Sequence, residues 1–445
     1  MKAFRPRGGT HLLYNIALGG ALLVSSPLWI PWAMMSPKRR KNFPERLGLR
    51  LAEIPAASGG KRVWIHAVSV GETLSAAPLI RRLRERIPDA EIMLSTVTIT
   101  GQETAGKVLG AETAARFYFP FDLPRIAGKF LDRLRPDAVV ILETEIWPNF
   151  LAECCGRGIP AMIVNGRISG RSFGRYARFR FFFSRVLACL TAITAQTGED
   201  AGRFLALGAP PSAVTVTGNM KFDVAQPMAA HTPLLALLTG EKDSAGTKWL
   251  IAGSTHEGEE EAVLRAFGEA RAVNGSVKLL LAPRHPERFG AVEELCRNKG
   301  WEVKRRTRIA EGSGEKLPPV ILLDTMGELS SAYAAGDIAF VGGSLVPKGG
   351  HNILEPALFG VPAVVGPHME NFREIAEIFR DARAIRQVRS ASELSSALVR
   401  WAADPSVEKE TGRRARELLA EFRGATERNV EVIERELQRG RRKTG

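Results

Sequence analysis

The sequence predicts an α/β protein made of two doubly wound domains, each with a parallel sheet covered by helices on both faces. Short, continuously apolar runs rich in Val, Ile and Leu alternate with amphipathic stretches, which is typical of parallel strands and their crossover helices. These runs fall into two sets of similar size. A segment rich in Pro, Ala and Gly separates the sets, so we expect two domains facing a cleft, with ligands at the carboxyl ends of the strands.

The two sets of strands follow one pattern along the chain. Between strands, apolar residues recur at helical spacing, as they do at Leu74, Ala77 and Ile80. In the first set we expect strands at 63–70, 91–96, 138–143, 161–165, 192–196 and 214–218. In the second set we expect strands at 248–254, 277–283, 319–324, 338–343 and 362–366.

Length and composition agree with this prediction. The chain has 445 residues, enough for two or three domains, and its 45% hydrophobic content excludes disorder of the whole chain. Four cysteines without a C-x-x-C pair exclude a disulfide scaffold and a zinc ribbon, and favour a reducing cytosolic compartment. We expect a membrane anchor over 1–41, Rossmann-like domains over 60–223 and 248–405, an interdomain linker over 224–247, and one long charged helix over 406–445.

The N-terminal segment predicts contact with a membrane. Residues 12–35 carry no charge over 24 positions, and about 20 apolar residues suffice to cross a bilayer as a helix. The basic cluster at 38–41 is denser than the one before the segment, so the positive-inside rule places the rest of the chain in the cytoplasm. A half-inserted, monotopic anchor remains an alternative to a single-pass helix. A cleaved signal peptide is disfavoured because no small-residue cleavage site follows.

The net charge of +14 predicts an anionic partner, which is a nucleic acid, an anionic membrane or a phosphorylated substrate. Residues 166–187 interleave arginines with aromatic residues. This stretch is either a solvated basic face with Phe in the core, or a surface that binds lipid phosphates. No RNA-binding signature accompanies it, so we expect no nucleic-acid partner. No oligomeric state is indicated by the sequence.

In the first domain, charged residues follow the ends of predicted strands. Glu72 comes directly after Gly71 at the start of a helix, and is either a helix-start acid or a general base. Glu143 and Glu145 follow another strand, and because they are two residues apart we expect only one to face the cleft. Lys221 lies near the linker, as either a solvated surface residue or a residue of the site.

In the second domain, residues 340–362 are the most constrained stretch. Glycines there, including Gly343 and Gly350, surround a turn that leads into a helix beginning near Asn352. We expect backbone N–H groups and the helix dipole to bind a phosphate, and Glu355 to accept hydrogen bonds from a ribose diol. The absence of a P-loop and of an opening G-x-G-x-x-G argues against a P-loop NTPase and a standard dinucleotide enzyme. No D-x-D motif occurs in the cleft segments, so we expect no metal and no cofactor.

Six segments in order, HAVSVGET, LETEIWPN, NGRISGRS, GNMKFD, APRHPER and GGSLVPKGGHNILEPA, resemble the 3-deoxy-D-manno-octulosonic acid (Kdo) transferase family. The resemblance covers nearly the whole chain. It implies the GT-B glycosyltransferase fold, with the acceptor bound by the first domain and the CMP-sugar by the second. It also implies inverting transfer of Kdo from CMP-Kdo to a lipid A precursor (lipid IVA), at the cytoplasmic face of the inner membrane with its anionic lipids, in lipopolysaccharide assembly.

The resemblance further implies roles for individual residues. Glu72 matches the family's general base, and Glu143 and Lys221 match positions assigned to transition-state stabilisation. The segments that match the CMP-binding positions are Pro283 and Arg284, then Met326, Gly327 and Glu328, and finally Asn352, Ile353, Leu354 and Glu355.

Two other functions stay open from the residues alone. One is a GT-B enzyme that uses a UDP-sugar and a lipid carrier, which differs in the nucleotide it binds. The other is a membrane-tethered binding protein without catalysis, which two strand-end glutamates and a nucleotide-binding half disfavour.

Overall fold

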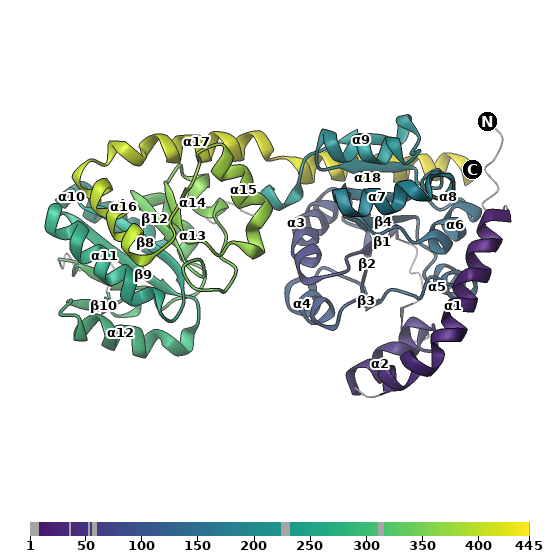
Figure 1. Cartoon of the computed structure of the whole chain (residues 1–445), viewed down its shortest axis with the longest axis horizontal. Helices are drawn as coiled ribbons and strands as arrows, with labels where there is room; N and C mark the ends of the chain where they lie inside the picture. Colours follow the sequence, from purple (N-terminus) through teal and green to yellow (C-terminus); the bar gives the residue numbers. More distant parts are fainter. Residues whose placement is uncertain are drawn as a thin grey trace. The chain divides into compact units, whose positions relative to one another are not determined.

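The computed structural model describes residues 9–34, 37–51, 54–55, 60–223, 232–309 and 316–444. These residues fold into two compact units (Figure 1). Unit 1 comprises Met1–Val224 and Arg423–Gly445, and unit 2 comprises Ala225–Phe422. Each of the four cysteines is a free thiol, as the sequence predicted.

The described part of unit 1 contains a seven-stranded parallel sheet with the strand order β3-β2-β1-β4-β5-β6-β7. The order reverses direction between β1 and β4, and in doubly wound sheets ligands bind at such a point. The strands are β1 (Arg62–His66), β2 (Glu91–Thr96), β3 (Ala115–Tyr118), β4 (Ala138–Leu142), β5 (Ala161–Gly166), β6 (Ala192–Ala195) and β7 (Val214–Val216).

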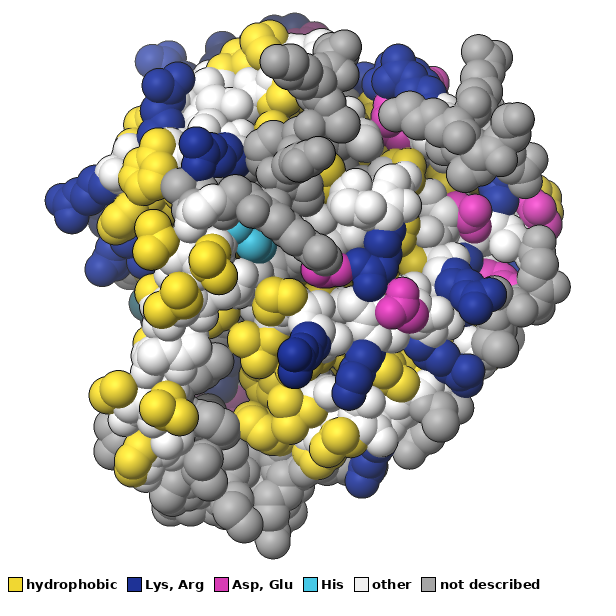
Figure 2. All heavy atoms as spheres, turned by 90° about the vertical axis from the view of Figure 1, so that its right-hand side faces the viewer, with side chains coloured by type: hydrophobic (Ala, Val, Ile, Leu, Met, Phe, Trp, Pro, Cys, Tyr) yellow, Lys and Arg dark blue, Asp and Glu magenta, His cyan; other side chains and the backbone are white. Residues whose placement is uncertain are grey.

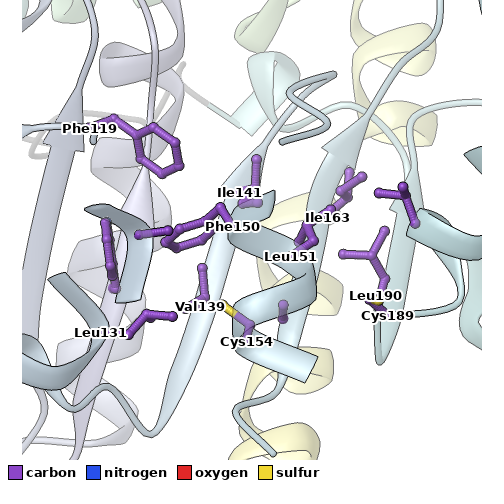
Figure 3. Packing of buried hydrophobic residues seen from close by; sticks show 14 of the residues in the cluster. Phe119, Leu131, Val139, Ile141, Phe150, Leu151, Cys154, Ile163, Cys189 and Leu190 are labelled. Atoms are coloured by element: carbon purple, nitrogen blue, oxygen red, sulfur yellow. The ribbon is translucent and has the colours of Figure 1, made fainter. Parts of the chain in front are cut away.

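Helices cover both faces of this sheet because successive residues of each strand point to opposite faces and both sets are apolar. On β1, Trp64 faces one cluster and Val63 and Ile65 face the other. Trp64 meets Phe150 edge-on, with ring centres 4.9 Å apart; Figure 3 shows Phe150 beside Ile141 and Leu151 in that cluster. The helices of unit 1 are α1 (Gly9–Met34), α2 (Pro37–Arg46), α3 (Val70–Arg86), α4 (Ile99–Leu109), α5 (Pro124–Leu134), α6 (Pro148–Gly156), α7 (Gly170–Arg178), α8 (Arg180–Leu187), α9 (Gly198–Ala206) and α18 (Ala425–Thr444).

The described part of unit 2 repeats the plan, with seven parallel strands in the order β10-β11-β9-β8-β12-β13-β14 and a switch point between β8 and β12. Its strands are β8 (Lys248–Thr255), β9 (Val277–Pro283), β10 (Val303–Arg305), β11 (Val320–Leu322), β12 (Ile338–Val341), β13 (Ala363–Val365) and β14 (Arg386–Gln387). Its helices are α10 (Pro233–Ala245), α11 (Glu259–Val273), α12 (Phe289–Asn298), α13 (Leu329–Ala332), α14 (Leu354–Leu358), α15 (Arg373–Asp381), α16 (Ala391–Ala403) and α17 (Ser406–Phe422).

The prediction of two doubly wound parallel sheets is confirmed. Among the described strands, the sequence missed β3, β10 and β14, and all three lie at sheet edges. These three strands are only partly buried, so they lack the continuous apolar run that identified the central strands.

Two of the expected connecting segments differ in the structure. Residues 224–231 of the expected linker lie outside the described residues, whereas α10 is a helix of unit 2 whose Leu234 and Leu238 are fully buried.

The single charged helix expected over 406–445 is two helices, α17 and α18. Gly424, at φ +86°, separates them in a left-handed conformation that ends helices, and Asp223 accepts the Gly424 and Thr426 N–H groups at 2.8 and 2.6 Å.

The predicted membrane-spanning segment forms α1. Tyr14 holds this helix against the rest of unit 1, because its hydroxyl donates to Asp122 at 3.3 Å and its ring lies 5.1 Å from that of Phe182. Across the described residues, however, no helix combines the length and the apolar character needed to cross a bilayer. The expectation of a transmembrane helix is therefore unsupported.

Candidate active site

Glu72 lies in the first turn of α3, beyond the carboxyl end of β1 and therefore at the switch point of unit 1. Ser69 caps the helix, since its hydroxyl oxygen accepts the Glu72 N–H at 3.4 Å and its O–H donates to Glu72 Oε1 at 3.1 Å. The Val68 N–H donates to Glu72 Oε2 at 2.7 Å. These bonds hold the carboxyl group in one orientation at the strand end.

The environment of Glu72 favours its protonated form. Burial raises the pKa of this carboxyl from 4.5 to about 7, and the negative charges of Glu143 and Glu145 act in the same direction. The hydrogen bonds from Val68 and Ser69 act in the opposite direction without offsetting the burial. A carboxyl group with a pKa near neutrality is suited to accept and release a proton at physiological pH.

Glu143 follows β4, the strand on the other side of the switch point, and pairs with Lys221. Its Oε1 lies 3.2 Å from Lys221 Nζ, and both side chains are partly exposed. The backbone of Glu143 has φ +58°, a left-handed conformation that is uncommon for a residue with a side chain and is often found at functional sites. Glu145 is also half-buried, and burial followed by the charge of Glu143 raises its pKa. The structure thus brings the three predicted residues of unit 1 into one cluster, together with Glu145.

Asn165 positions the lysine of this cluster, and the sequence analysis gave it no role. It is the next-to-last residue of β5, has φ +57°, is fully buried, and its Oδ1 accepts the Met220 N–H at 2.9 Å. Lys221 is the next residue, in the 3-10 helix Met220–Asp223. The signal that was available is the Asn-Gly pair at the end of a strand, since Asn tolerates the left-handed conformation better than most residues.

In unit 2, Pro283 and Arg284 lie at the carboxyl end of β9. Pro283 is buried, so only Arg284 presents an exposed side chain. The Arg284 N–H donates to Thr255 O at 2.9 Å, which ties the end of β9 to the end of β8. Within the described residues Arg284 forms no ion pair, so its guanidinium group is available to an anionic ligand.

The glycine-rich turn does not present its N–H groups as the sequence predicted. The carboxylate of the fully buried Glu259 accepts three of them, from Gly343 at 2.7 Å, Ser344 at 3.0 Å and Leu345 at 2.9 Å. Glu259 is the first residue of α11, more than 80 residues away in the sequence. An internal carboxylate therefore takes the place that we expected a phosphate to occupy.

The segment from Asn352 to Glu355 begins a helix close to the predicted place, but α14 has only five residues, which limits its dipole. Asn352 Oδ1 accepts the Leu354 N–H at 3.1 Å, and its Nδ2 donates to Glu355 Oε1 at 3.2 Å. Burial raises the pKa of Glu355. Ile353 and Leu354 are buried in the core, so their side chains do not face a ligand.

The segment from Met326 to Glu328 is a loop that precedes α13. Met326 is 70% exposed, and Gly327 adopts φ +88°. Glu328 accepts a hydrogen bond from Thr325 and lies 3.7 Å from Arg306 Nε. Of the two side chains in this segment, Glu328 therefore stabilises the loop itself and Met326 is exposed. Among the described residues, no group of three or more His, Cys, Asp or Glu residues is arranged to hold a metal ion.

Comparison with known proteins gives consistent similarities. The family model described as 3-Deoxy-D-manno-octulosonic-acid transferase (kdotransferase) matches residues 41–224. The 3-deoxy-D-manno-octulosonic acid transferase of Haemophilus influenzae is 35% identical over 94% of this chain and 97% of its own length. The protein of the same name from Bordetella pertussis is 34% identical over 95% of this chain and 98% of its own.

Two solved structures are also similar to this chain. The C-terminal CMP-Kdo binding domain of WaaA from Acinetobacter baumannii is 32% identical, covers 42% of this chain and 99% of its own, and has a TM-score of 0.38. A structure named for a UDP-N-acetylglucosamine 2-epimerase of Listeria monocytogenes covers 86% of this chain and 98% of its own with a TM-score of 0.50. At 15% identity, the second structure shows a common fold only.

Proposed function

Because this chain belongs to the 3-deoxy-D-manno-octulosonic acid (Kdo) transferase family of glycosyltransferases, we propose that it transfers Kdo from CMP-Kdo to a lipid A precursor (lipid IVA) in lipopolysaccharide assembly. The observation that carries the proposal is the end-to-end similarity to relatives of that name, at 35% identity over 94% of the chain. The decisive experiment incubates the purified protein with CMP-Kdo and a tetraacyl lipid A precursor and measures product masses. A mass increase by one or more Kdo residues supports the proposal, and an unchanged acceptor mass contradicts it.

In the proposed reaction, Glu72 is the general base. A sugar hydroxyl is a poor nucleophile near neutral pH, so its proton must be removed as its oxygen attacks. The acceptor oxygen forms a bond to the anomeric carbon of Kdo, and its proton passes to Glu72. The bond from that carbon to the phosphate oxygen of CMP breaks, and CMP leaves with the electron pair. Attack on the face opposite to CMP inverts the configuration at the anomeric carbon.

The pair of Glu143 and Lys221 supports the charge distribution that this reaction needs. Its transition state resembles an oxocarbenium ion, as in glycoside hydrolysis. The carboxylate of Glu143 would stabilise the positive charge that develops on the sugar ring. Lys221 forms an ion pair with that carboxylate at 3.2 Å and would also bind either the Kdo carboxylate or the phosphate.

Unit 2 is the proposed binding site for CMP-Kdo. Arg284 would bind the phosphate, and the backbone at Asn352 would add a smaller contribution from the start of α14. Glu355 would accept hydrogen bonds from the ribose hydroxyl groups. We expect transfer without a metal ion, since these residues neutralise the leaving group with a guanidinium group instead.

We also propose that unit 1 contacts the cytoplasmic face of the inner membrane through α1, α7 and α8. Phe179 and Phe181, where α7 meets α8, are 58% and 62% exposed, and Leu13 of α1 is 66% exposed. Figure 2 shows exposed hydrophobic side chains next to Lys and Arg on this side of the molecule. Residues 166–187 contain six arginines and no acidic residue, which suits an anionic lipid surface.

Vesicle sedimentation tests this location. Replacing both aromatic residues, Phe179→Ser with Phe181→Ser, should reduce binding to vesicles that contain an anionic lipid. The matched control is Val273→Ser, which removes an exposed apolar side chain from unit 2. Equal loss in the two proteins, or no loss in either, would contradict the proposed surface.

A further inference from the structure

Two histidines of unit 2 form a direct contact that the proposed mechanism does not use. His256 follows β8, and His351 lies in the loop after β12, the neighbouring strand. Their Nε2 atoms are 2.8 Å apart. The ring planes differ by only 3° while the ring centres are 5.1 Å apart, so the two rings meet head to head rather than face to face. This is the geometry of an N–H···N hydrogen bond, in which one proton lies between the two nitrogens.

The fold holds this pair in place from both sides. The Oε2 atom of Glu259 accepts the backbone N–H of His256 at 2.9 Å, and the same oxygen accepts the backbone N–H of Gly343 at 2.7 Å. Gly343 adopts φ +67°, and a Cβ atom there would lie 2.9 Å from His351 Cδ2. Glycine is therefore required at this position by both the backbone conformation and the space beside the histidine ring.

The charged groups around the pair are mainly cationic. Arg284, His285 and Lys348 face it from the loops after β9 and β12, and Glu259 of α11 faces His256. Burial, and then the neighbouring His256, Arg284 and His285, lower the pKa of His351 to about 4. Burial also lowers the pKa of His256, while Glu259 opposes that effect. Since both rings are then neutral near pH 7, one donates its Nε2 proton to the other, and the two rings have opposite tautomers.

Such a site is suited to an anion. Of the described residues, neither Arg284 nor Lys348 is in an ion pair, and both side chains are exposed. A bound phosphate would offset the repulsion that keeps the histidine pair neutral, so the pair would accept one proton in addition to the one that each neutral ring carries. Each ring would then carry a proton on Nδ1 as well, and the pair would become a cation with two outward donors.

We propose that His256 and His351 bind the phosphate of the nucleotide as a pair and take up one proton when it binds. The inference rests on the proposed function, because it assigns the pair to the binding of CMP-Kdo. His351 is half-exposed, which leaves it accessible to a ligand, whereas His256 is buried and supports it.

Isothermal titration calorimetry with CMP tests the proposal in the full-length protein. The titration is done at pH 7.5 in two phosphate-free buffers that differ in ionisation enthalpy, so that the number of protons taken up is measured. The variants are His351→Gln and His256→Gln, because the Gln amide replaces the Nε2 contact without being titratable. The matched control is His285→Gln, whose exposed ring lies 5.2 Å from His256 but forms no ring-nitrogen bond with it.

The expected result is proton uptake in the wild type and in His285→Gln, and less uptake in the other two variants. Removal of one charged hydrogen-bond donor should weaken CMP binding by about tenfold to hundredfold. Cytidine, which lacks the phosphate, should bind equally to all four proteins. Inorganic phosphate alone should show the same variant dependence as CMP if the site recognises the phosphate group.

Three results would overturn the inference. These are an unchanged proton uptake and CMP affinity in His351→Gln, an equal effect in His285→Gln, or an equal loss of cytidine affinity. If the wild-type protein is folded but binds no CMP and gives no product from CMP-Kdo, it is the proposed function that fails. If it binds CMP and turns over CMP-Kdo but the variants behave as the wild type, only the inference about the histidine pair fails.

Discussion

Replacement of Glu72 by Gln has two consequences that follow from the same pKa. The amide keeps the size of the side chain and can still accept the hydrogen bond from the Val68 N–H, but it cannot accept a proton. Loss of a general base should reduce kcat by about 10²- to 10⁴-fold, while CMP-Kdo binding by unit 2 is retained. In the wild type, kcat should rise with pH through about 7, since Glu72 must be deprotonated to act. That rise should be absent from the residual activity of the variant.

The second consequence concerns the free energy of unfolding. Folding raises the pKa of Glu72 from 4.5 to about 7, so the proton bound by the native state stabilises it below the unfolded pKa. That stabilisation is lost as the pH rises through about 7. At high pH the ionised carboxylate lowers the free energy of unfolding by about 3 kcal/mol relative to a side chain that does not titrate. This value follows because each pKa unit corresponds to about 1.4 kcal/mol. This value is an upper limit, because solvent reaches part of the side chain and screens the charge.

Urea unfolding of the full-length protein, followed by circular dichroism at pH 5 and pH 8.5, measures this difference. Glu72→Gln should be more stable than the wild type at pH 8.5 by up to about 3 kcal/mol, and the gain should be much smaller at pH 5. Glu72→Asp is a useful companion, because it retains a carboxyl group but shortens the side chain. The reasoning is refuted if the stability difference between Glu72→Gln and the wild type is the same at both pH values, or if Glu72→Gln keeps near-normal kcat.

Three further predictions concern the same sites. Glu145→Gln should shift the rise of kcat to lower pH, because the charge of Glu145 raises the pKa of Glu72, and an unchanged pH–rate profile would contradict that coupling. Arg284→Ala should weaken CMP binding in calorimetry by about tenfold or more, whereas the control Arg297→Ala, on the surface of α12, should not. Equal CMP affinities of the two variants would exclude Arg284 from the phosphate site. Activity should persist in EDTA, and a loss of activity that Mg²⁺ restores would show that transfer depends on a metal ion.

Most of the fold could be predicted from the sequence because central strands of a parallel sheet are apolar on both faces. β1 and β8 therefore stand out as continuous runs, whereas the edge strands β3, β10 and β14 do not. The C-terminal helices show a further limit. Their charged pattern continues through Gly424, and the break there depends on Asp223, about 200 residues earlier in the chain.

The candidate site divides in the same way. Glu143 and Arg284 each follow a strand directly, and Glu72 lies in the first turn of the helix that follows β1, so their positions at the carboxyl edge of a sheet could be predicted from local sequence. The approach of Lys221 to Glu143 could not, because it depends on Asn165 holding the backbone at Met220.

By itself, then, the sequence determined two parallel α/β sheets, the residues at their strand ends and the resemblance to one family. The tertiary structure decided which of those residues meet. Glu259 takes the N–H groups of the glycine-rich turn from 84 residues away, and His256 meets His351 across 95 residues. The reason is that local patterns record whether a residue is apolar or polar, whereas a hydrogen bond between distant segments is determined by the order and register of the strands that carry them.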